Sequence, residues 1–379
     1  MKSSAIDVVV ISPMPSRGDR APSGVAHYVE ELLAGLPLEM VSRVRVLAQR
    51  DAMSGPYVFP CWREGWWAPW DIARAVRRLR PQTVHLQHEI RILGGVGPGL
   101  LLIPLLFVLR CRCRIVVTVH GVVPRNEIGS LTASTGANLK SHLIQAALWV
   151  VYRVHGAIAD ALIVHHAFFR EALIRDYGVK PMKVRVVPMG YHEPTTQPKA
   201  PSAPDRLRVL VFGFLTDYKH PEDVVTLMES PEGAGICLRI SISLNPRNRS
   251  AGYIARFENL KARCARLSPA VSWLGYIPED ELASVVADSD TVVLPYTSCI
   301  AVSGVATWAL EQGVPLAYDR KVAPLLGEGP AAYDPAPGSV RDAMFAAARR
   351  EGQEGVGASF APWPVVAAAT QGIWAGDSR

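Results

Sequence analysis

Short apolar runs rich in β-branched residues recur along the first half of the chain, and segments with apolar residues every three or four positions lie between them. The runs are typical of strands buried on both faces of a parallel sheet, and the intervening segments are typical of amphipathic helices. This alternation predicts a doubly wound α/β domain. We expect strands at 8–11, 44–47, 83–86, 115–119, 161–164 and 184–187, and helices at 25–36, 70–79 and 167–176.

A proline-rich stretch without apolar periodicity follows, with the composition of a linker, and the pattern of strands and helices then restarts. The second half therefore predicts another Rossmann-like α/β domain, with a helix from Pro221 and strands at 209–212, 238–242, 271–274, 291–294 and 315–318. The last segment, with Trp363 and Trp374, predicts a helix outside this rhythm. We divide the chain into a first domain at 1–192, a linker at 193–206, a second domain at 207–361 and a C-terminal helix at 362–379.

The composition supports this picture. A chain of 379 residues exceeds the size at which a single core stops growing, and 49% hydrophobic with 20% charged residues excludes a disordered chain. The net charge of +6 favours anionic partners, but no basic cluster indicates nucleic acid. Six scattered cysteines and the pair His165 and His166 lack the spacing of a metal site, so we expect none.

Two segments bear on localisation. The N-terminus has too short an apolar run for a signal peptide and predicts a first buried strand in a cytoplasmic protein. The most apolar run, at 99–109, is about half as long as a membrane span requires. Because Arg110, Arg112 and Arg114 follow it, the run fits either a buried helix or a helix in peripheral contact with an anionic membrane surface.

Ligands in open α/β sheets bind outside the carboxyl ends of the strands. In the first half, Gly24 begins a helix whose amides favour an anion, although an ordinary N-cap fits equally well. His120 directly follows a strand, which predicts a side chain at the cleft rim that contacts a sugar hydroxyl or a leaving phosphate. His88 and Glu89, after the preceding strand, are candidate acceptor-binding residues.

In the second half, two strand ends predict a site for a diphosphate. Gly213 permits a tight turn after the first strand, and Lys219 in the following loop is a candidate point charge for a phosphate. After a later strand, Ser303 begins a helix whose first amides, at Gly304 and Val305, favour an anion at the positive end of the dipole. The chain has no P-loop motif, which disfavours phosphoryl transfer from ATP.

These motifs resemble glycosyltransferase family 4, which has the GT-B fold, over nearly the whole chain. SGVAHYVEELLAGL resembles the family's glycine loop and first helix, and VVTVHG carries its cleft histidine at His120. The segment at 159–190 is similar to the one before the family's linker. FGFLTDYKHPEDV resembles its phosphate loop with Lys219, and VSWLGYIPEDELASVVADSDTVVLPY resembles the run that follows. PWPVVAAATQGIW looks like the helix that crosses back to the first domain. The QHE sequence at 87–89 is similar to that of exopolysaccharide-assembly enzymes.

The resemblance implies two domains that face a central cleft and a retaining, metal-independent hexosyltransferase. Its donor would be a UDP- or GDP-linked sugar, with no cofactor, and its acceptor would be a glycan or a lipid-linked glycan. Lys219 would bind the donor diphosphate, Tyr276 would border the nucleobase, and His120 would face the transferred sugar.

The chain departs from the family pattern at three charged positions. Phe214 stands where the family has an arginine, and Ile300 and Trp308 align with two glutamates. Glu311 lies one helical turn beyond Trp308, so it is a candidate partial substitute in donor binding. The missing carboxylates motivate an alternative, a catalytically weak homologue that acts as a binding or assembly subunit. A sugar-phosphate epimerase of similar fold is disfavoured because it needs acid–base carboxylates in the cleft.

Overall fold

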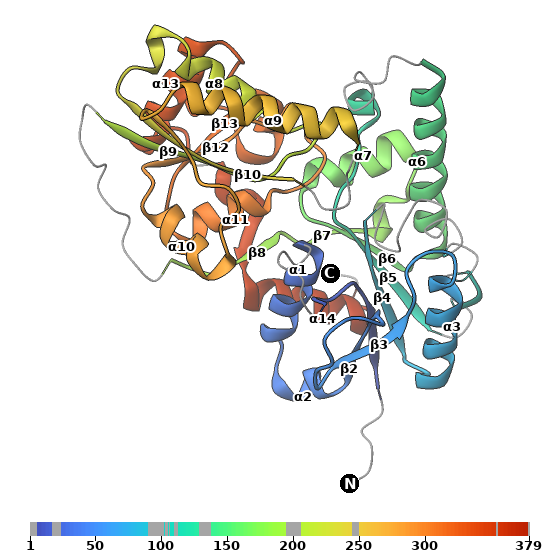
Figure 1. The fold of residues 1–379 in the computed structure, drawn as a ribbon. Coiled ribbons are helices and arrows are strands. Elements are labelled where there is room, and N and C mark those ends of the chain that lie inside the picture. The colour runs from blue at the N-terminus through green and yellow to red at the C-terminus, as the bar shows by residue number, and fades with distance from the viewer. Residues whose placement is uncertain are drawn as a thin grey trace.

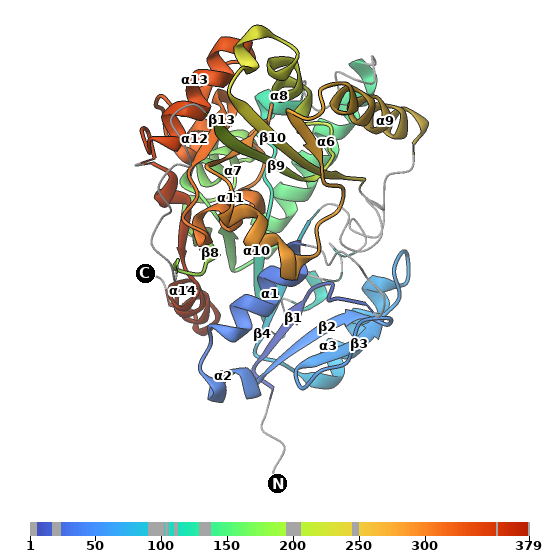
Figure 2. The same cartoon turned by 60° about the vertical axis from the view of Figure 1, so that its left-hand side comes forward.

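The computed structural model describes residues 6–16, 24–89, 102, 105, 107–109, 113–128, 138–194, 206–244, 250–353 and 355–377. Two parallel sheets, each covered by helices, are joined by a short third sheet (Figure 1). A view turned by 60° shows the two sheets in separate parts of the molecule, with helices packed around each (Figure 2). The predicted α/β class with two Rossmann-like domains is confirmed.

The first domain is built on a seven-stranded parallel sheet. Its strands are β1 (Val8–Ile11), β2 (Val44–Gln49), β3 (Val58–Trp62), β4 (Thr83–His88), β5 (Arg114–Val119), β6 (Ala161–Val164) and β7 (Val184–Val186). They lie in the order β3-β2-β1-β4-β5-β6-β7, so the strand order reverses between β1 and β4. Helices cover the sheet, namely α1 (Gly24–Ala34), α2 (Leu38–Ser42), α3 (Ala68–Leu79), α6 (Asn138–Ile158) and α7 (Ala167–Tyr177).

The edge strand β3 is the one strand of the described first sheet that the sequence pattern does not predict. Pro60 lies within it, and proline lacks the amide hydrogen that a central strand would use. An edge position tolerates this loss because one side of the strand makes no ladder. Trp62 anchors the strand, since its ring is fully buried and its indole nitrogen donates to the Leu47 carbonyl at 3.2 Å.

The second domain repeats this design on a six-stranded parallel sheet. Its strands are β9 (Leu207–Phe214), β10 (Ile236–Ser243), β11 (Val271–Trp273), β12 (Thr291–Leu294), β13 (Leu316–Asp319) and β14 (Ala332–Tyr333). The order β11-β10-β9-β12-β13-β14 places the reversal between β9 and β12. The helices are α8 (Pro221–Met228), α9 (Ala251–Arg266), α10 (Glu279–Ala287), α11 (Gly304–Glu311), α12 (Ala323–Leu326) and α13 (Pro337–Ala348). In both domains the predicted strands are present with each end within two residues of the expected position.

The chain crosses between the domains at the short third sheet. Strand β8 (Met189–Tyr191) pairs in parallel with β15 (Phe360–Pro362), and α14 (Trp363–Ala375) then packs against α1 of the first domain (Figure 1). Gly190 is required there, because a Cβ at this position would lie 2.3 Å from the Trp363 ring. Residues from the far end of the chain therefore complete the first domain. Most of the predicted linker, 195–205, lies outside the described residues.

Polar contacts hold the C-terminal end of α14 on the first sheet. Thr83 Oγ1 donates to the Trp374 carbonyl at 3.2 Å, and the Trp374 indole donates to His85 Nδ1 at 3.0 Å. Arg114 Nε donates to the Ile373 carbonyl at 3.1 Å. Arg114, one of the basic residues considered for a membrane surface, is therefore used inside the fold.

The apolar run at 99–109 lies largely outside the described residues, as do Arg110 and Arg112. Leu102 and Leu109 are buried, whereas Phe107 and Val108 are exposed. No helix in the described part of the chain is both long and apolar enough to span a bilayer.

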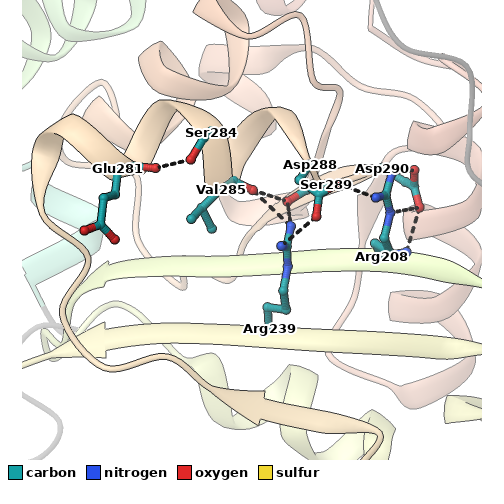
Figure 3. A network of polar contacts seen from close by, with 8 residues as sticks. All are labelled: Arg208, Arg239, Glu281, Ser284, Val285, Asp288, Ser289 and Asp290. Atoms are coloured by element: carbon teal, nitrogen blue, oxygen red, sulfur yellow. Dashed lines mark hydrogen bonds and ion pairs between the residues drawn. The ribbon is translucent and has the colours of Figure 1, made fainter.

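A network of arginines and aspartates fixes the start of the second sheet against the end of α10 (Figure 3). Arg208, on β9, contacts Asp288 and both carboxylate oxygens of Asp290, with Nη2 3.2 Å from Oδ1. Arg239, on β10, contacts Asp288 Oδ2 at 3.1 Å and donates to Ser289 Oγ at 2.8 Å. The network therefore positions the chain where it enters β12, whose carboxyl end leads to the candidate site.

Replacement of Asp290 by alanine is expected to lower the free energy of unfolding by about 3 kcal/mol. The Asp290 side chain is only 3% exposed, and its removal leaves the mostly buried Arg208 guanidinium without a main partner. Asp280→Ala, at an exposed position on the preceding helix α10, is the control and should change the free energy of unfolding by less than about 0.5 kcal/mol in urea. Equal losses for the two variants would contradict this role of Asp290.

Candidate active site

The loops after β5 and β12 bring the two domains into contact. Val122 N donates to the Ile300 carbonyl at 2.9 Å, and the neighbouring residues form an isolated antiparallel bridge. Close by in sequence, Ser298 Oγ donates to Glu127 Oε2 at 2.9 Å. Strand ends at which the sequence predicts a site therefore meet in the structure.

Lys219 lies in the loop between β9 and α8. Gly213 has a φ of +119°, which side-chain-bearing residues rarely adopt, and a Cβ there would lie 3.3 Å from Lys219 Nζ and 3.4 Å from Val305 Cγ2. The ammonium group also lies 4.9 Å from the centre of the Tyr296 ring. The structure thus brings together the glycine, the lysine and the start of α11.

The positive end of α11 lies beside this ammonium group. Ser303 is the N-cap, and its Oγ accepts from Ala306 N at 3.4 Å and lies 3.0 Å from Tyr296 Oη. Gly304 is exposed, and a Cβ there would meet no atom within 4 Å. The first amides of an α-helix have no intrahelical acceptor, so those of Gly304 and Val305 are suited to an anion. The lysine charge and the helix dipole therefore act on the same small region.

Arg256, on α9, braces the loop that carries Lys219. Its Nη2 donates to the Lys219 carbonyl at 2.7 Å, and its Nη1 donates to the Thr216 carbonyl at 2.9 Å. An ion pair with Glu222, with Nε 2.6 Å from Oε1, orients the guanidinium. The lysine is thus presented by a loop whose backbone is held by a charged hydrogen-bond donor.

His120 lies in a chain of polar side chains within the first domain. Its Nε2 lies 2.8 Å from Gln87 Oε1, and its Nδ1 lies 3.3 Å from His165 Nε2. His165 Nδ1 in turn lies 3.0 Å from the Val187 carbonyl oxygen. Burial, and then the neighbouring histidines, hold the pKa of His120 well below its ordinary value, so the ring is neutral near pH 7.

The hydrogen positions in this series of hydrogen bonds can be assigned by starting from the Val187 carbonyl. A carbonyl only accepts, so His165 Nδ1 donates to it, and His165 Nε2 then accepts from His120 Nδ1. Neutral His120 must accept at Nε2, which requires Gln87 to present its NH₂ group there. Both nitrogens of His120 are therefore engaged, and a sugar hydroxyl would have to replace Gln87 or His165 as a partner.

His88 and Glu89, expected on the acceptor side, lie in different environments. His88 is buried, its ring centre is 4.5 Å from that of His155, and burial holds its pKa well below the ordinary value. Glu89 is exposed just after β4. Burial raises the pKa of Tyr218 in the second domain, and the Glu89 charge adds to this effect. Glu89 therefore lies near the opposite domain, whereas His88 packs inside its own.

Glu311 joins α11 to the crossover between the domains. Its Oε1 accepts from His192 N at 2.9 Å, and His192 Nε2 lies 2.8 Å from Glu31 Oε2 on α1. Burial raises the pKa of the Glu311 carboxyl. Within the described structure no ion pair joins Glu311 to Lys219, so the structure does not bring these two predicted donor-binding residues into direct contact.

The remaining residues of interest lie around this region. Gly24 is the exposed first residue of α1, and Tyr276, in the loop between β11 and α10, is 45% exposed. Phe214 ends β9, while Ile300 and Trp308 are partly buried and pack against the hydrophobic core. The apolar residues at the positions of the two glutamates therefore contribute to packing.

Four residues of the site escape sequence analysis. Gln87 and His165 contact His120 from 33 and 45 positions away, and Arg256 contacts Lys219 from 37 positions away. Gln87, His165 and Tyr296 lie at or just after the ends of β4, β6 and β12, and this position is the sequence signal that could have found them. Among the described residues, no group of three His, Cys, Asp or Glu side chains is arranged to hold a metal ion.

Residues 6–193 match the family model described as Glycosyltransferase Family 4. The chain carries a Glycosyltransferase Family 4 domain. The predicted resemblance is thereby confirmed, and the matched segment spans the first sheet, His120 and the crossover strand β8. No curated protein matches the sequence significantly.

Solved structures of glycosyltransferases resemble this chain over nearly its full length. Anabaena HepE in complex with UDP-glucose has a TM-score of 0.67 at 12% identity, covering 97% of this chain and 99% of that chain. Sucrose-phosphate synthase from Thermosynechococcus elongatus has a TM-score of 0.69 at 14% identity, covering 97% and 98%. The lipopolysaccharide outer core galactosyltransferase WaaB has a TM-score of 0.57 at 12% identity, covering 98% and 96%. These likenesses show the fold, and the predicted GT-B architecture is confirmed.

Proposed function

We propose that this protein is a retaining glycosyltransferase that moves a sugar from a nucleotide-sugar donor to a glycan or a lipid-linked glycan. The family match and the fold support a glycosyltransferase. We further propose a hexose linked to UDP or GDP as the donor. One structural neighbour was solved with UDP-glucose and another is named a galactosyltransferase, which supports a hexose and, of the two nucleotides, UDP. We further propose a role in polysaccharide biosynthesis in the cytoplasm.

The observation that carries this proposal is the convergence of Lys219 Nζ and the first turn of α11 beside Gly213. When the bond between the sugar and the diphosphate breaks, negative charge increases on the departing oxygen. A fixed ammonium group and helix amides at that point stabilise the leaving group without rearranging during the reaction. In this proposal the protein supplies the positive charge, and no metal ion is needed.

His120 faces the transferred sugar in this proposal, and Glu89 lies on the acceptor side. The acceptor hydroxyl attacks from the face that the diphosphate leaves, and its proton passes to the departing phosphate oxygen as the bond between sugar and diphosphate breaks. The configuration at the sugar carbon is therefore retained without a protein nucleophile. The hydrogen bond that His120 accepts from Gln87 and the one that it donates to His165 fix the ring before the sugar arrives, and a sugar hydroxyl then replaces one of these partners. A ring held in one orientation loses less freedom on binding, which favours a defined sugar position.

A catalytically weak homologue that binds sugars or assembles with an active transferase is the second candidate. The observation that favours it is the packing of Ile300 and Trp308 where the family pattern has glutamates. Glu311, the nearest carboxylate on α11, is bonded to the backbone of His192. In the family pattern two glutamates would contact the ribose and the sugar. In this chain other groups would have to make those contacts.

A panel of UDP- and GDP-linked sugars, incubated with the purified protein and a glycan acceptor, separates the two candidates. Release of the nucleoside diphosphate together with an extended acceptor supports the transferase. Nucleotide-sugar binding without turnover by any member of the panel supports the second candidate. Failure of the protein to bind any of these nucleotides would contradict the transferase and would leave only the assembly role of the second candidate.

A further inference from the structure

Three tryptophans stand exposed at the start of α3. Their exposed fractions are 63% for Trp66, 60% for Trp67 and 67% for Trp70. Each ring could bury on the order of 200 Å² of apolar surface, so exposure of three neighbours leaves a substantial apolar patch in water. Exposed patches of this kind mark interaction surfaces.

Arginines continue the same face toward the end of the helix. Successive residues of an α-helix are rotated by about 100°, so Trp70, Arg74, Arg77 and Arg78 fall within a sector of about 100°. All four are exposed, and the opposite side of the helix is buried at Ile72. Trp67, the N-cap residue, also has helical backbone angles, so it extends this exposed face of the helix by one residue. We call Trp66, Trp67, Trp70, Arg74, Arg77 and Arg78 the Trp–Arg face.

The Trp–Arg face carries uncompensated positive charge. Arg74, Arg77 and Arg78 make no ion pair with any described residue. The one acidic residue of α3, Asp71, is already paired with Arg63, whose Nε lies 2.9 Å from Oδ2. The Arg63 guanidinium, neutralised by this pair, lies 5.1 Å from the centre of the Trp67 ring, so the uncompensated charge of the face comes from the three helix arginines.

We infer that the Trp–Arg face binds an anionic membrane surface. Tryptophan rings favour the boundary between headgroups and acyl chains, and arginines bind lipid phosphates beside them. Figure 1 shows α3 on the face of the first sheet away from α1 and α14 and remote from the second domain. A membrane bound there leaves the region between the domains accessible. An uncharged glycan would use the rings and could accept hydrogen bonds from the arginines, but it would gain no attraction between opposite charges, so the anionic lipid surface is favoured.

The test is sedimentation of the full chain with vesicles of phosphatidylglycerol and phosphatidylcholine, compared with phosphatidylcholine alone. The unchanged protein should bind the anionic vesicles far more tightly, and salt should weaken that binding. Each arginine should contribute roughly fivefold, so the triple variant R74Q/R77Q/R78Q should bind roughly a hundredfold more weakly. The triple variant W66A/W67A/W70A should bind at least about tenfold more weakly to the same vesicles.

Matched controls remove an exposed tryptophan and three exposed basic residues elsewhere on the surface. Trp149→Ala removes a tryptophan that is 48% exposed on α6, and K261Q/R266Q/K321Q removes three exposed charges of the second domain. Both controls should bind the vesicles as the unchanged protein does.

Retention of vesicle binding by the two triple variants would overturn the inference. A second result would also overturn it. If the unchanged protein bound no vesicles but bound soluble alginate, and the triple variants lost that binding, the face would be a surface for acidic glycans. The readout needs no transferase activity, so it stands apart from the proposed function.

Discussion

Lys219→Ala is expected to weaken binding of UDP or GDP by about 2 kcal/mol, or roughly thirtyfold. The variant removes the ammonium group beside Gly213 and the first turn of α11, and charged hydrogen bonds to phosphate are the contacts that it loses. Uridine and guanosine lack these phosphates, so their binding should change little. Isothermal titration with nucleoside diphosphate and nucleoside measures both losses on the same protein.

The control for this experiment is Lys321→Ala, which removes an exposed lysine from the same domain. It should leave both affinities unchanged, apart from a small effect of net charge. Equal losses for nucleoside and nucleoside diphosphate in Lys219→Ala would contradict contact between Lys219 and the phosphates.

The protein is expected to lose stability steeply in mild acid. Burial lowers the pKa of His85 to about 3 and the pKa values of His155 and His165 to about 4, and the pKa values of His88 and His120 lie well below the ordinary value. In the unfolded chain each titrates near pH 6.5, so below that pH the unfolded state binds more protons. Stability is complete above about pH 6.5 and falls until the folded pKa values are reached. Each of the three histidines with a folded pKa of about 3 or 4 costs about 2 kcal/mol between pH 7 and pH 5, and His88 and His120 act in the same direction, so the loss approaches a typical total stability.

Urea unfolding at pH 7.5 and pH 5.5 measures this effect. His155→Gln should reduce the pH dependence by about a fifth, because one of the five buried groups no longer titrates. His142→Gln, at an exposed position of the same helix, should leave the dependence unchanged. Buried carboxyls such as Glu311, with a raised pKa, act in the opposite direction and partly offset the loss. Equal stability at the two pH values would show that these histidines do not titrate with unfolding.

The fold could be predicted because its evidence is local. Strands buried on both faces, such as β1 and β6, consist of continuous apolar runs, and these are visible in any window of the sequence. The positions of Lys219 and Ser303 were predictable for the same reason, since each follows a strand that the pattern reveals. Strand β3 was missed because Pro60 argues against a strand unless its edge position is known.

The contacts of His120 could not be predicted because they depend on the pairing of distant strands. Gln87 comes from β4 and His165 follows β6, on the two sides of β5, and the sequence does not state which side chains meet across them. His88 illustrates the same limit. The end of a strand predicted an acceptor contact, whereas the structure packs its ring against His155 on α6.

The arginines after the apolar run at 99–109 show that the sequence alone does not reveal which basic side chains are exposed on the surface. Arg114 follows an apolar run in sequence, yet it donates to a carbonyl of α14. The tryptophans and arginines of α3 are equally visible in the sequence, but their alignment on one face depends on the helix and its buried side.

A crystal structure of the protein with bound UDP or GDP tests the central claim most directly. The account predicts the diphosphate within hydrogen-bond distance of Lys219 Nζ and of the first amides of α11, at Gly304 and Val305. A diphosphate bound elsewhere, for example at the start of α1 near Gly24 with Lys219 making no contact, would contradict it.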